Sequence, residues 1–258
     1  MTSQSELAKN IETYLRPQTF AVGVKLLKSA DDLPARVSPV SLSYHHKITT
    51  CQMFGWARRN GIATAAFKGD MNCPVGIAVM GLGQRPDYVL NGSNTVRRYC
   101  RTLEGAALTE REMNCFDVGN YAGLAVAPLN SCDFDIDLAL IYGNGLQVTR
   151  LIQAALYEKG GRFTVSVIPG AVCADILVPP VRDNRCSLGF PCWGDRIHAG
   201  TNDNEIVFSI PFSRFGEIAS GLAESHEAGM KVPVPQDTSY EPQMPPVYER
   251  YIKDMGIE

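Results

Sequence analysis

The sequence predicts an α/β or α+β fold of two related halves, each a small mixed sheet with helices, with a cysteine-bearing site between them. Two segments, residues 61–73 and 161–173, lie 100 residues apart, and each begins with glycine and ends in cysteine. A run of helical periodicity precedes both, so in each place a glycine ends a helix, a β-type run follows and a turn delivers the cysteine. Because residue identity between the segments is near chance, the order of elements carries this prediction.

The first half, about residues 20–130, follows a short amphipathic helix and is predicted from apolar periodicity and capping residues. The predicted elements are helix 5–14, strand 20–27, helix 51–60 with Thr49 or Thr50 as N-cap, strand 61–67, a turn or short helix 73–80, helices 94–101 and 103–112, and strand 121–129.

The second half, about residues 136–225, repeats the order of strand, helix, strand, cysteine turn and a last strand that ends in proline. Its predicted elements are strand 136–142, helix 146–158, strand 163–168, a turn at Cys173, strand 206–211 and helix 214–226. We expect the halves to join near residues 105–120 and to form one domain over 1–258. Five prolines between Lys231 and Val247 predict an irregular tail before a short last helix.

The glycines around Asn144 follow a predicted strand and precede a predicted helix, as in a nucleotide-binding loop. This turn contains two glycines, Gly143 and Gly145, whereas the dinucleotide-binding fingerprint needs three glycines at a fixed spacing. A plain strand-to-helix turn is therefore predicted.

The bulk composition predicts an ordinary globular protein that binds neither nucleic acid nor membrane. The net charge is −3 and the isoelectric point is about 5.9, which gives no basic surface for a polyanion. The first residues are polar rather than signal-like, and no long apolar run indicates a membrane span. We therefore expect a cytoplasmic protein, in which disulfides are uncommon.

The eight cysteines include no Cys-x-x-Cys pair and no ferredoxin spacing, which argues against a small structural zinc site. Cys51 lies at a predicted helix start, where thiolate is favoured, and Cys73 and Cys173 lie on turns after strands. Cys192 lies in the run Pro191-Cys192-Trp193-Gly194, where backbone amides can approach its sulfur and the Trp193 ring is expected to shield it from water. Four thiolates from separate loops suit a 4Fe–4S cluster, so these four cysteines are the predicted cofactor and metal ligands. The remaining cysteines, Cys100, Cys115, Cys132 and Cys186, are predicted to lie outside the site.

Motifs spread from about residue 19 to residue 222 together carry a resemblance to a known family. They are Val24-Lys25-Leu26, the run from Cys51 to Arg58, Asp70-Met71-Asn72-Cys73, Ala127-Pro128-Leu129, Cys173-Ala174-Asp175, and the run from Pro191 to Arg196 followed by Glu205. In order and spacing the chain resembles the uncharacterised family catalogued as domain of unknown function 169, or ArCR. The resemblance implies recurrent cysteines at the positions of Cys51, Cys73, Cys173 and Cys192, and implies no reaction.

The predicted catalytic residues are Arg196, His198 and Lys25. Arg196 has the planar fork that binds a carboxylate, or it pairs with Asp195 or Glu205. His198 is the histidine nearest to a motif, and Lys25 is unusual in an apolar strand.

Four further residues have simpler explanations. His45 and His46 are predicted to be solvated. Asp70 and Asp175 flank the two cysteine turns and are predicted to form turns rather than to contact a metal.

The function expected from these residues is iron–sulfur chemistry, redox or Lewis-acid, on a small organic substrate. Three cysteine ligands would leave one iron open to substrate, whereas four favour electron transfer to a partner protein. A non-catalytic metal-binding or sensory module, with zinc or iron, is one alternative. A metal-free thiol enzyme that uses Cys51 or Cys192 with a histidine is another. Oligomeric state is not predicted.

Overall fold

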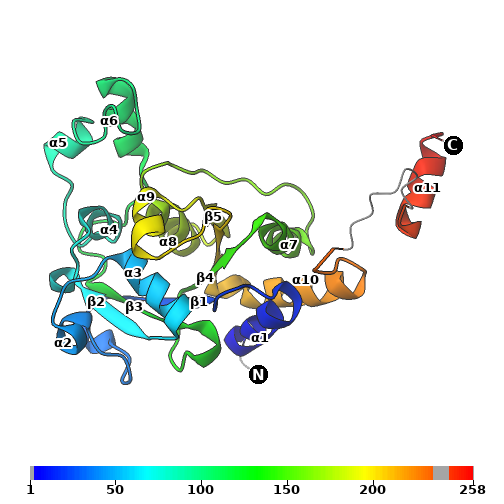
Figure 1. The fold of residues 1–258 in the computed structure, drawn as a ribbon, viewed down its shortest axis with the longest axis horizontal. Coiled ribbons are helices and arrows are strands. Elements are labelled where there is room, and N and C mark those ends of the chain that lie inside the picture. The colour runs from blue at the N-terminus through cyan, green and yellow to red at the C-terminus, as the bar shows by residue number, and fades with distance from the viewer. Residues whose placement is uncertain (1–2, 235–243, 258) are drawn as a thin grey trace.

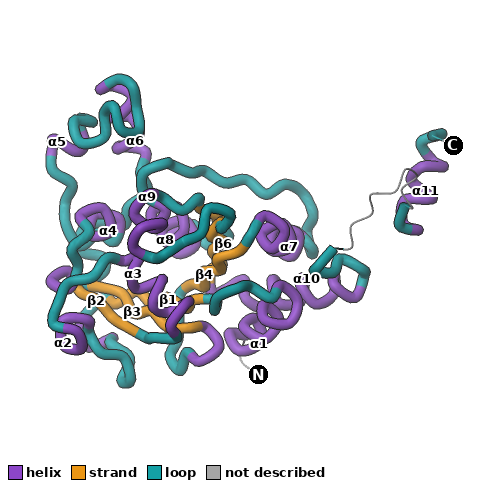
Figure 2. Tube along the Cα trace, viewed as in Figure 1, coloured by secondary structure: helices purple, strands orange, loops and turns teal. Residues whose placement is uncertain are grey.

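A computed structural model describes residues 3–234 and 244–257 as a mixed α/β fold around one antiparallel sheet (Figures 1 and 2). Its six strands lie in the order β2-β3-β1-β4-β6-β5, and all neighbours are antiparallel. The strands are β1 (Val22–Leu27), β2 (Thr64–Phe67), β3 (Gly123–Pro128), β4 (Leu138–Gly143), β5 (Ser187–Gly189) and β6 (Ile206–Pro211). The predicted fold class is confirmed, but the strands form one continuous antiparallel sheet rather than two small mixed sheets.

Eleven α-helices surround this sheet within the described ranges. They are α1 (Ser3–Asn10), α2 (Val40–Tyr44), α3 (Thr50–Gly55), α4 (Pro74–Val79), α5 (Asp87–Leu90), α6 (Leu103–Glu112), α7 (Gly145–Leu156), α8 (Val172–Arg182), α9 (Trp193–His198), α10 (Phe215–Glu227) and α11 (Pro246–Asp254). Short π-helical turns η1 (Ile11–Leu15) and η3 (Trp56–Asn60) extend α1 and α3. Four 3-10 turns are η2 (Ala30–Asp32), η4 (Lys68–Asp70), η5 (Leu129–Ser131) and η6 (Phe212–Arg214). None of the helices in the described ranges is both long and apolar enough to cross a membrane.

The two faces of the sheet bury different hydrophobic residues because strand side chains alternate between faces. Leu138 and Leu140 pack with α3, α4 and α8, whereas Ala139 and Ile141 pack with α1, α7 and α10. Figure 1 shows α3, α4, α8 and α9 grouped on one side and α1 with α10 on the other. The first of these faces carries the candidate site.

The strand order repeats at the two ends of the sheet. From the middle outward, the first three strands lie as β1, β3, β2 and the last three as β4, β6, β5. Their ladders match in register: Val22 faces Pro128 where β1 meets β3, and Leu138 faces Pro211 where β4 meets β6. A 3-10 turn follows each proline. This arrangement is what two related halves would produce, and their duplication stays a prediction.

Two of the predicted elements are wrong. Residues 163–168 form no strand in this structure but belong to the loop that joins α7 to α8, as Figure 2 shows. Residues 94–101 form turns instead of a helix, since Arg97 takes a positive φ of 67°. The predicted junction of the two halves near residues 105–120 falls on α6 and the residues that follow it, and the division into halves stays a prediction.

Several predicted helix starts and ends are confirmed. Gly61, at φ 72°, ends the helix that starts at Thr50, as a left-handed C-cap does. Asn144 caps α7 in a reciprocal arrangement with Gln147, which makes the Gly143–Gly145 turn a helix start, as predicted. The predicted tail falls partly on residues 235–243, which lie outside the described residues, and α11 confirms the last helix.

Candidate functional site

Each of the four predicted ligand cysteines stands at the beginning of a helix. Cys51 and Cys173 are the second residues of α3 and α8. Cys73 and Cys192 immediately precede α4 and α9 as their N-cap residues. The prediction that Cys173 lies on a turn is therefore wrong, because it is already within α8. Since α3 packs against α9 and α4 against α8, the four helix starts lie on one side of the sheet (Figure 1).

Backbone pairing fixes the start of α3 beside the start of α4. The Ile48 N–H donates to the Asp70 carbonyl at 2.8 Å, and the Asn72 N–H donates back to Ile48 at 3.1 Å. The N–H of Gly76 then donates to the Cys73 sulfur at 3.4 Å. A side chain at Gly76 would collide with Thr50, whose hydroxyl lies only 2.7 Å from the position of a β-carbon. The two helix starts are thus in close contact.

The thiols of the four cysteines influence one another. Hydrogen bonding to Cys192 is the largest cause that raises the pKa of Cys51, followed by burial and by the charges of Asp195 and Cys173. Burial, followed by the charges of Cys192 and Cys73, raises the pKa of Cys173. Cys51, Cys73, Cys173 and Cys192 are therefore electrostatic neighbours, although they come from four separate elements.

Cys192 is the thiolate of this group. The hydrogen bond from the Cys51 thiol lowers the pKa of Cys192 to about 6, with further help from the backbone N–H groups of Val172 and Asp195 and against the effect of burial. At neutral pH Cys192 is thus charged, while Cys51 and Cys173 keep their protons. Cys51 and Cys173 are buried, whereas Cys73 and Cys192 are half-buried, so the group opens to solvent on their side.

Two buried polar atoms beside these cysteines have no hydrogen-bond partner within the described residues. The hydroxyl of Thr50, a residue only 2% exposed, neighbours Cys51 in sequence and the Cys73 helix start in space. Oδ1 of Asp175, in a residue 1% exposed, is the other. Burial, opposed by the Ile168 N–H and helped by the Cys192 charge, raises the pKa of Asp175 to about 7. Asp175 therefore reaches back from α8 to the preceding loop and is not the predicted turn former.

A buried polar network continues from Cys51 away from the other thiols. Asp195 lies within hydrogen-bonding reach of Cys51 and accepts hydrogen bonds from Tyr142 at 3.2 Å and Thr201 at 2.6 Å. The guanidinium of Arg58 lies 4.1 Å from the centre of the Tyr142 ring. It also forms a two-pronged ion pair with Glu205, at 2.7 and 3.1 Å. Arg58 and Glu205 belong to the sequence motifs, but their pairing was not predicted, because no local pattern reveals a contact between residues so far apart in the chain.

Two of the predicted catalytic residues, Arg196 and His198, lie together on α9, whereas Lys25 lies on β1. Arg196 donates to Asp203 at 3.1 Å, so the predicted pairing with Asp195 or Glu205 is wrong. His198 is exposed on α9, and a side chain at Gly194 would lie 3.9 Å from the Cys192 sulfur and 4.0 Å from the His198 ring. His198 therefore flanks the cysteine group.

Lys25 is on the far face of the sheet from the cysteines. Its neighbours Val24 and Leu26 point into the core that contains Cys173, so alternation turns Lys25 to the other face. On that face burial raises the pKa of Asp137, and the charge of Lys25 partly opposes the rise. Lys25 does not join the candidate site.

The surroundings of Trp193, Asp70, His45 and His46 test the remaining predictions about single residues. Trp193 is 70% exposed, so the expectation that it shields Cys192 from water is wrong. Asp70 accepts the Phe67 N–H at 2.8 Å and is a turn former, as predicted. His45 and His46 are exposed, as predicted, and His46 packs with Tyr44 against Trp56.

The other four cysteines have contacts of their own. Cys100 pairs with the Thr109 hydroxyl at 3.3 Å, and Cys132 donates to the Phe134 carbonyl at 3.4 Å. Arg214 donates to Cys186 at 3.4 Å, and Arg85 and Glu110 are the charges nearest to Cys115.

The cysteine group is not a preformed ligand set. Among the residues that the structure describes, no three His, Cys, Asp or Glu side chains already stand in an arrangement that could hold a metal ion. The four thiols are thus neighbours whose sulfurs would have to turn towards a common centre to share one.

Comparison with known proteins gives a family and one relative. The model of the uncharacterised ArCR family, domain of unknown function 169, matches residues 10–221. An uncharacterised protein of Methanocaldococcus jannaschii is 27% identical over 227 residues, which are 84% of this chain and 92% of the relative. No solved structure matches the chain significantly.

Proposed function

The chain belongs to the uncharacterised ArCR family, and we propose that its cysteines 51, 73, 173 and 192 hold a 4Fe–4S cluster in an enzyme that acts on a small organic molecule. The observation that carries the proposal is the coupling of four cysteines from four separate helix starts: Cys51, Cys173 and Cys192 shift one another's pKa, and the Cys73 charge helps to raise the pKa of Cys173. Cysteines that only fill a core have no reason to gather in this way.

The electrostatics of the group favour a bound cation. Raised pKa values at Cys51 and Cys173 mean that these thiols resist a second and third negative charge beside the Cys192 thiolate. A positively charged iron–sulfur core removes that resistance, because metal binding releases thiol protons and compensates the charges. The sulfurs themselves are the ligands that iron–sulfur clusters require.

The surroundings of the sulfurs also fit such a group. Backbone N–H groups of Gly76, Val172 and Asp195 point at the Cys73 and Cys192 sulfurs, and hydrogen bonds of this kind tune cluster potentials. The unpaired Thr50 hydroxyl and Asp175 carboxyl oxygen are polar atoms that burial leaves in need of a partner. A cofactor with exposed sulfides would give the Thr50 hydroxyl an acceptor.

The bound cluster would supply electron transfer or, with an open iron, Lewis-acid activation of the substrate. The chain's own residues would do the rest. Half-exposed Cys73 and Cys192 mark the side from which substrate enters, and His198 on that side is placed to exchange a proton with it. An electron-transfer partner protein would approach from the same side. We further propose a cytoplasmic location, since all eight thiols are unpaired and a reducing compartment keeps them so.

A second candidate function rests on a different feature of the same residues. Cys192 is a half-buried thiolate with a pKa of about 6, next to the Cys51 thiol, which is the arrangement of a reactive cysteine with a neighbouring thiol. In that case the protein is a metal-free thiol enzyme.

One absorption spectrum separates these functions. Protein purified without oxygen should show the broad visible charge-transfer absorption of an iron–sulfur cluster, bleached by dithionite if the cluster is redox-active. Colourless protein that contains zinc would instead favour a structural or sensory metal site. Colourless, metal-free protein in which Cys192 is alkylated rapidly would favour the metal-free thiol enzyme.

A further inference from the structure

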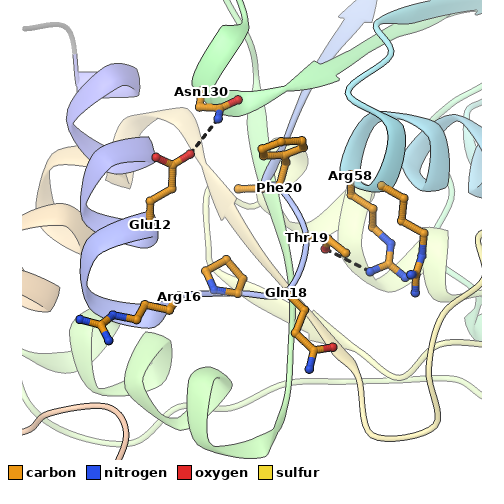
Figure 3. A pocket seen from close by; sticks show the side chains of 10 residues that line it. Glu12, Arg16, Gln18, Thr19, Phe20, Arg58 and Asn130 are labelled. Carbon is orange, nitrogen blue, oxygen red and sulfur yellow. Dashed lines mark hydrogen bonds between the residues drawn. The ribbon is translucent and has the colours of Figure 1, made fainter.

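A groove on the surface of the protein is lined by three arginines. It has a volume of about 780 Å³ and lies between the end of η1, the segment that leads to β1, η3 and η5. Arg16, Arg58 and Arg59 line it together with Glu12, Phe20 and Asn130. Figure 3 shows Arg58 at one side, Phe20 between, and Glu12 with Asn130 at the other. We call this feature the arginine groove; its size is in the range of small-molecule sites, roughly 300–1,000 Å³.

Arg58 forms the buried wall of the groove and is nearly saturated. Its terminal nitrogens donate to Glu205, to Thr201 at 3.2 Å and to Thr19 at 3.2 Å, which leaves Nε as a buried donor without a partner. The residue is only 1% exposed, so Nε cannot turn to bulk water. Arg58 therefore closes this side of the groove and offers no accessible donor to a ligand.

Arg59 and Arg16 bring donors that protein partners do not use. Arg59 donates through one terminal nitrogen to the Gly200 carbonyl, and the same nitrogen lies 3.6 Å from Glu205. The guanidinium of Arg16 has no hydrogen bond or ion pair with any residue that the structure describes. Glu12 is occupied by the Asn130 amide at 2.8 Å. Counting Glu205, three cations face two carboxylates, so the groove attracts negative charge.

The groove also has an apolar surface. Phe20 is 43% exposed although it directly precedes buried residues of the sheet, and Pro17 and Ala21 continue the surface beside it. An aromatic ring left open between arginines can cover the apolar part of a ligand whose charged group meets a guanidinium.

We propose that the arginine groove binds a small organic anion, a carboxylate or a phosphate monoester, with its charged group at Arg59 and its apolar part on Phe20. Guanidinium groups recognise carboxylate and phosphate through charge-assisted, paired hydrogen bonds. A chain of contacts through Arg58, Tyr142 and Asp195 links the groove to Cys51. Its ligand binding does not depend on the proposed cluster.

Calorimetric titration with benzoate, phenyl phosphate and inorganic phosphate tests this site and separates the two anion types. The folded wild-type protein should bind benzoate or phenyl phosphate saturably, and Arg59→Gln should weaken that binding at least about tenfold, the effect of losing one charge-assisted hydrogen bond. Phe20→Ala should weaken both aromatic probes and leave inorganic phosphate unchanged. Arg16→Gln should weaken all probes by a smaller factor.

Arg250→Gln is the matched control, because Arg250 is an exposed arginine on α11 outside the groove. It should bind as wild type does. Thermal unfolding of each variant shows that the fold is retained, and iron content measured on the same samples reports on the cluster separately. Absence of saturable binding by any probe, or equal affinity of wild type and Arg59→Gln, would overturn the proposal.

Discussion

Cys51 and Cys192 hold opposite protonation states because they share one hydrogen bond. The Cys51 thiol donates to Cys192, which raises the pKa of the first and lowers that of the second to about 6. A single proton therefore stands between two of the proposed ligands. Metal binding would release it, whereas in the metal-free protein it makes Cys192 the nucleophile of the pair.

The pH dependence of alkylation tests this arrangement. In metal-free, reduced protein, the rate of Cys192 modification by iodoacetamide should rise with pH and reach half of its maximum near pH 6, because only the thiolate reacts. Cys51→Ala removes the donor, so the midpoint should move up towards the roughly 8.5 of a free thiol. Cys100→Ala, the control, should leave it in place. A midpoint that Cys51→Ala does not move would disprove the hydrogen bond; mass spectrometry of the Cys192 peptide gives the rates.

Among the elements, α3 and α9 approach so closely that glycine is required between them. A β-carbon at Gly55 would lie 2.9 Å from the Ala199 α-carbon and 3.1 Å from its carbonyl oxygen, at the end of α9. These are backbone atoms, which cannot rotate away. The contact therefore sets the distance between the helix that carries Cys51 and the helix that follows Cys192.

Gly55→Ala should push the two helices apart. We expect a loss of roughly 1–3 kcal/mol in the free energy of unfolding, the usual cost of overpacking, and a higher midpoint for Cys192 alkylation. Gly216→Ala is the control, because Gly216 also lies in a helix but has nothing within 4 Å of a β-carbon. Its stability should stay within about 0.5 kcal/mol of wild type, as is usual for surface substitutions. Urea unfolding measures both, and equal stability of Gly55→Ala and wild type would show that the contact is not tight.

The elements that sequence patterns predict well are those whose pattern matches their burial. Residues 103–112 and 206–211 have the predicted bounds because capping and alternation decide them locally. Residues 163–168 alternate like a strand, and Phe163 and Val165 do pack on the core, but no neighbouring strand is available to pair with them. The partners that build the buried network, such as Glu205 for Arg58, depend on long-range packing that one sequence does not display.

In the whole molecule, the sheet suggests a different symmetry from the one that the sequence predicts. The sequence aligns Cys73 with Cys173. In the sheet, however, Thr64 of β2 faces Val126, and Ser187 of β5 faces Ser209, at matching places in the two ladders. One cysteine-bearing helix start precedes each of these edge strands and one follows. The topology thus pairs Cys51 with Cys173 and Cys73 with Cys192.

A crystal structure should show this internal symmetry. Superposing β1, β2 and β3 on β4, β5 and β6 should place Val22 on Leu138 and Pro128 on Pro211. The starts of α3 and α4 should then fall on the starts of α8 and α9. The sequence alone could not give this pairing, since α5 and α6 lengthen only the first half and shift the numbering. Helix starts on unrelated sides after superposition would refute the duplication.

The central claim is that four cysteines of this fold share one cluster, and iron and sulfide analysis of eight Cys→Ser variants tests it most directly. Each protein is purified without oxygen, and its fold is checked by thermal unfolding. Wild type should contain about four irons and four sulfides per chain, as a 4Fe–4S cluster requires. Cys51→Ser, Cys73→Ser, Cys173→Ser and Cys192→Ser should lose most of both, whereas Cys100→Ser, Cys115→Ser, Cys132→Ser and Cys186→Ser should keep them. Metal-free wild-type protein, or a loss of iron in a variant of the second group with no loss in the first, would contradict the claim.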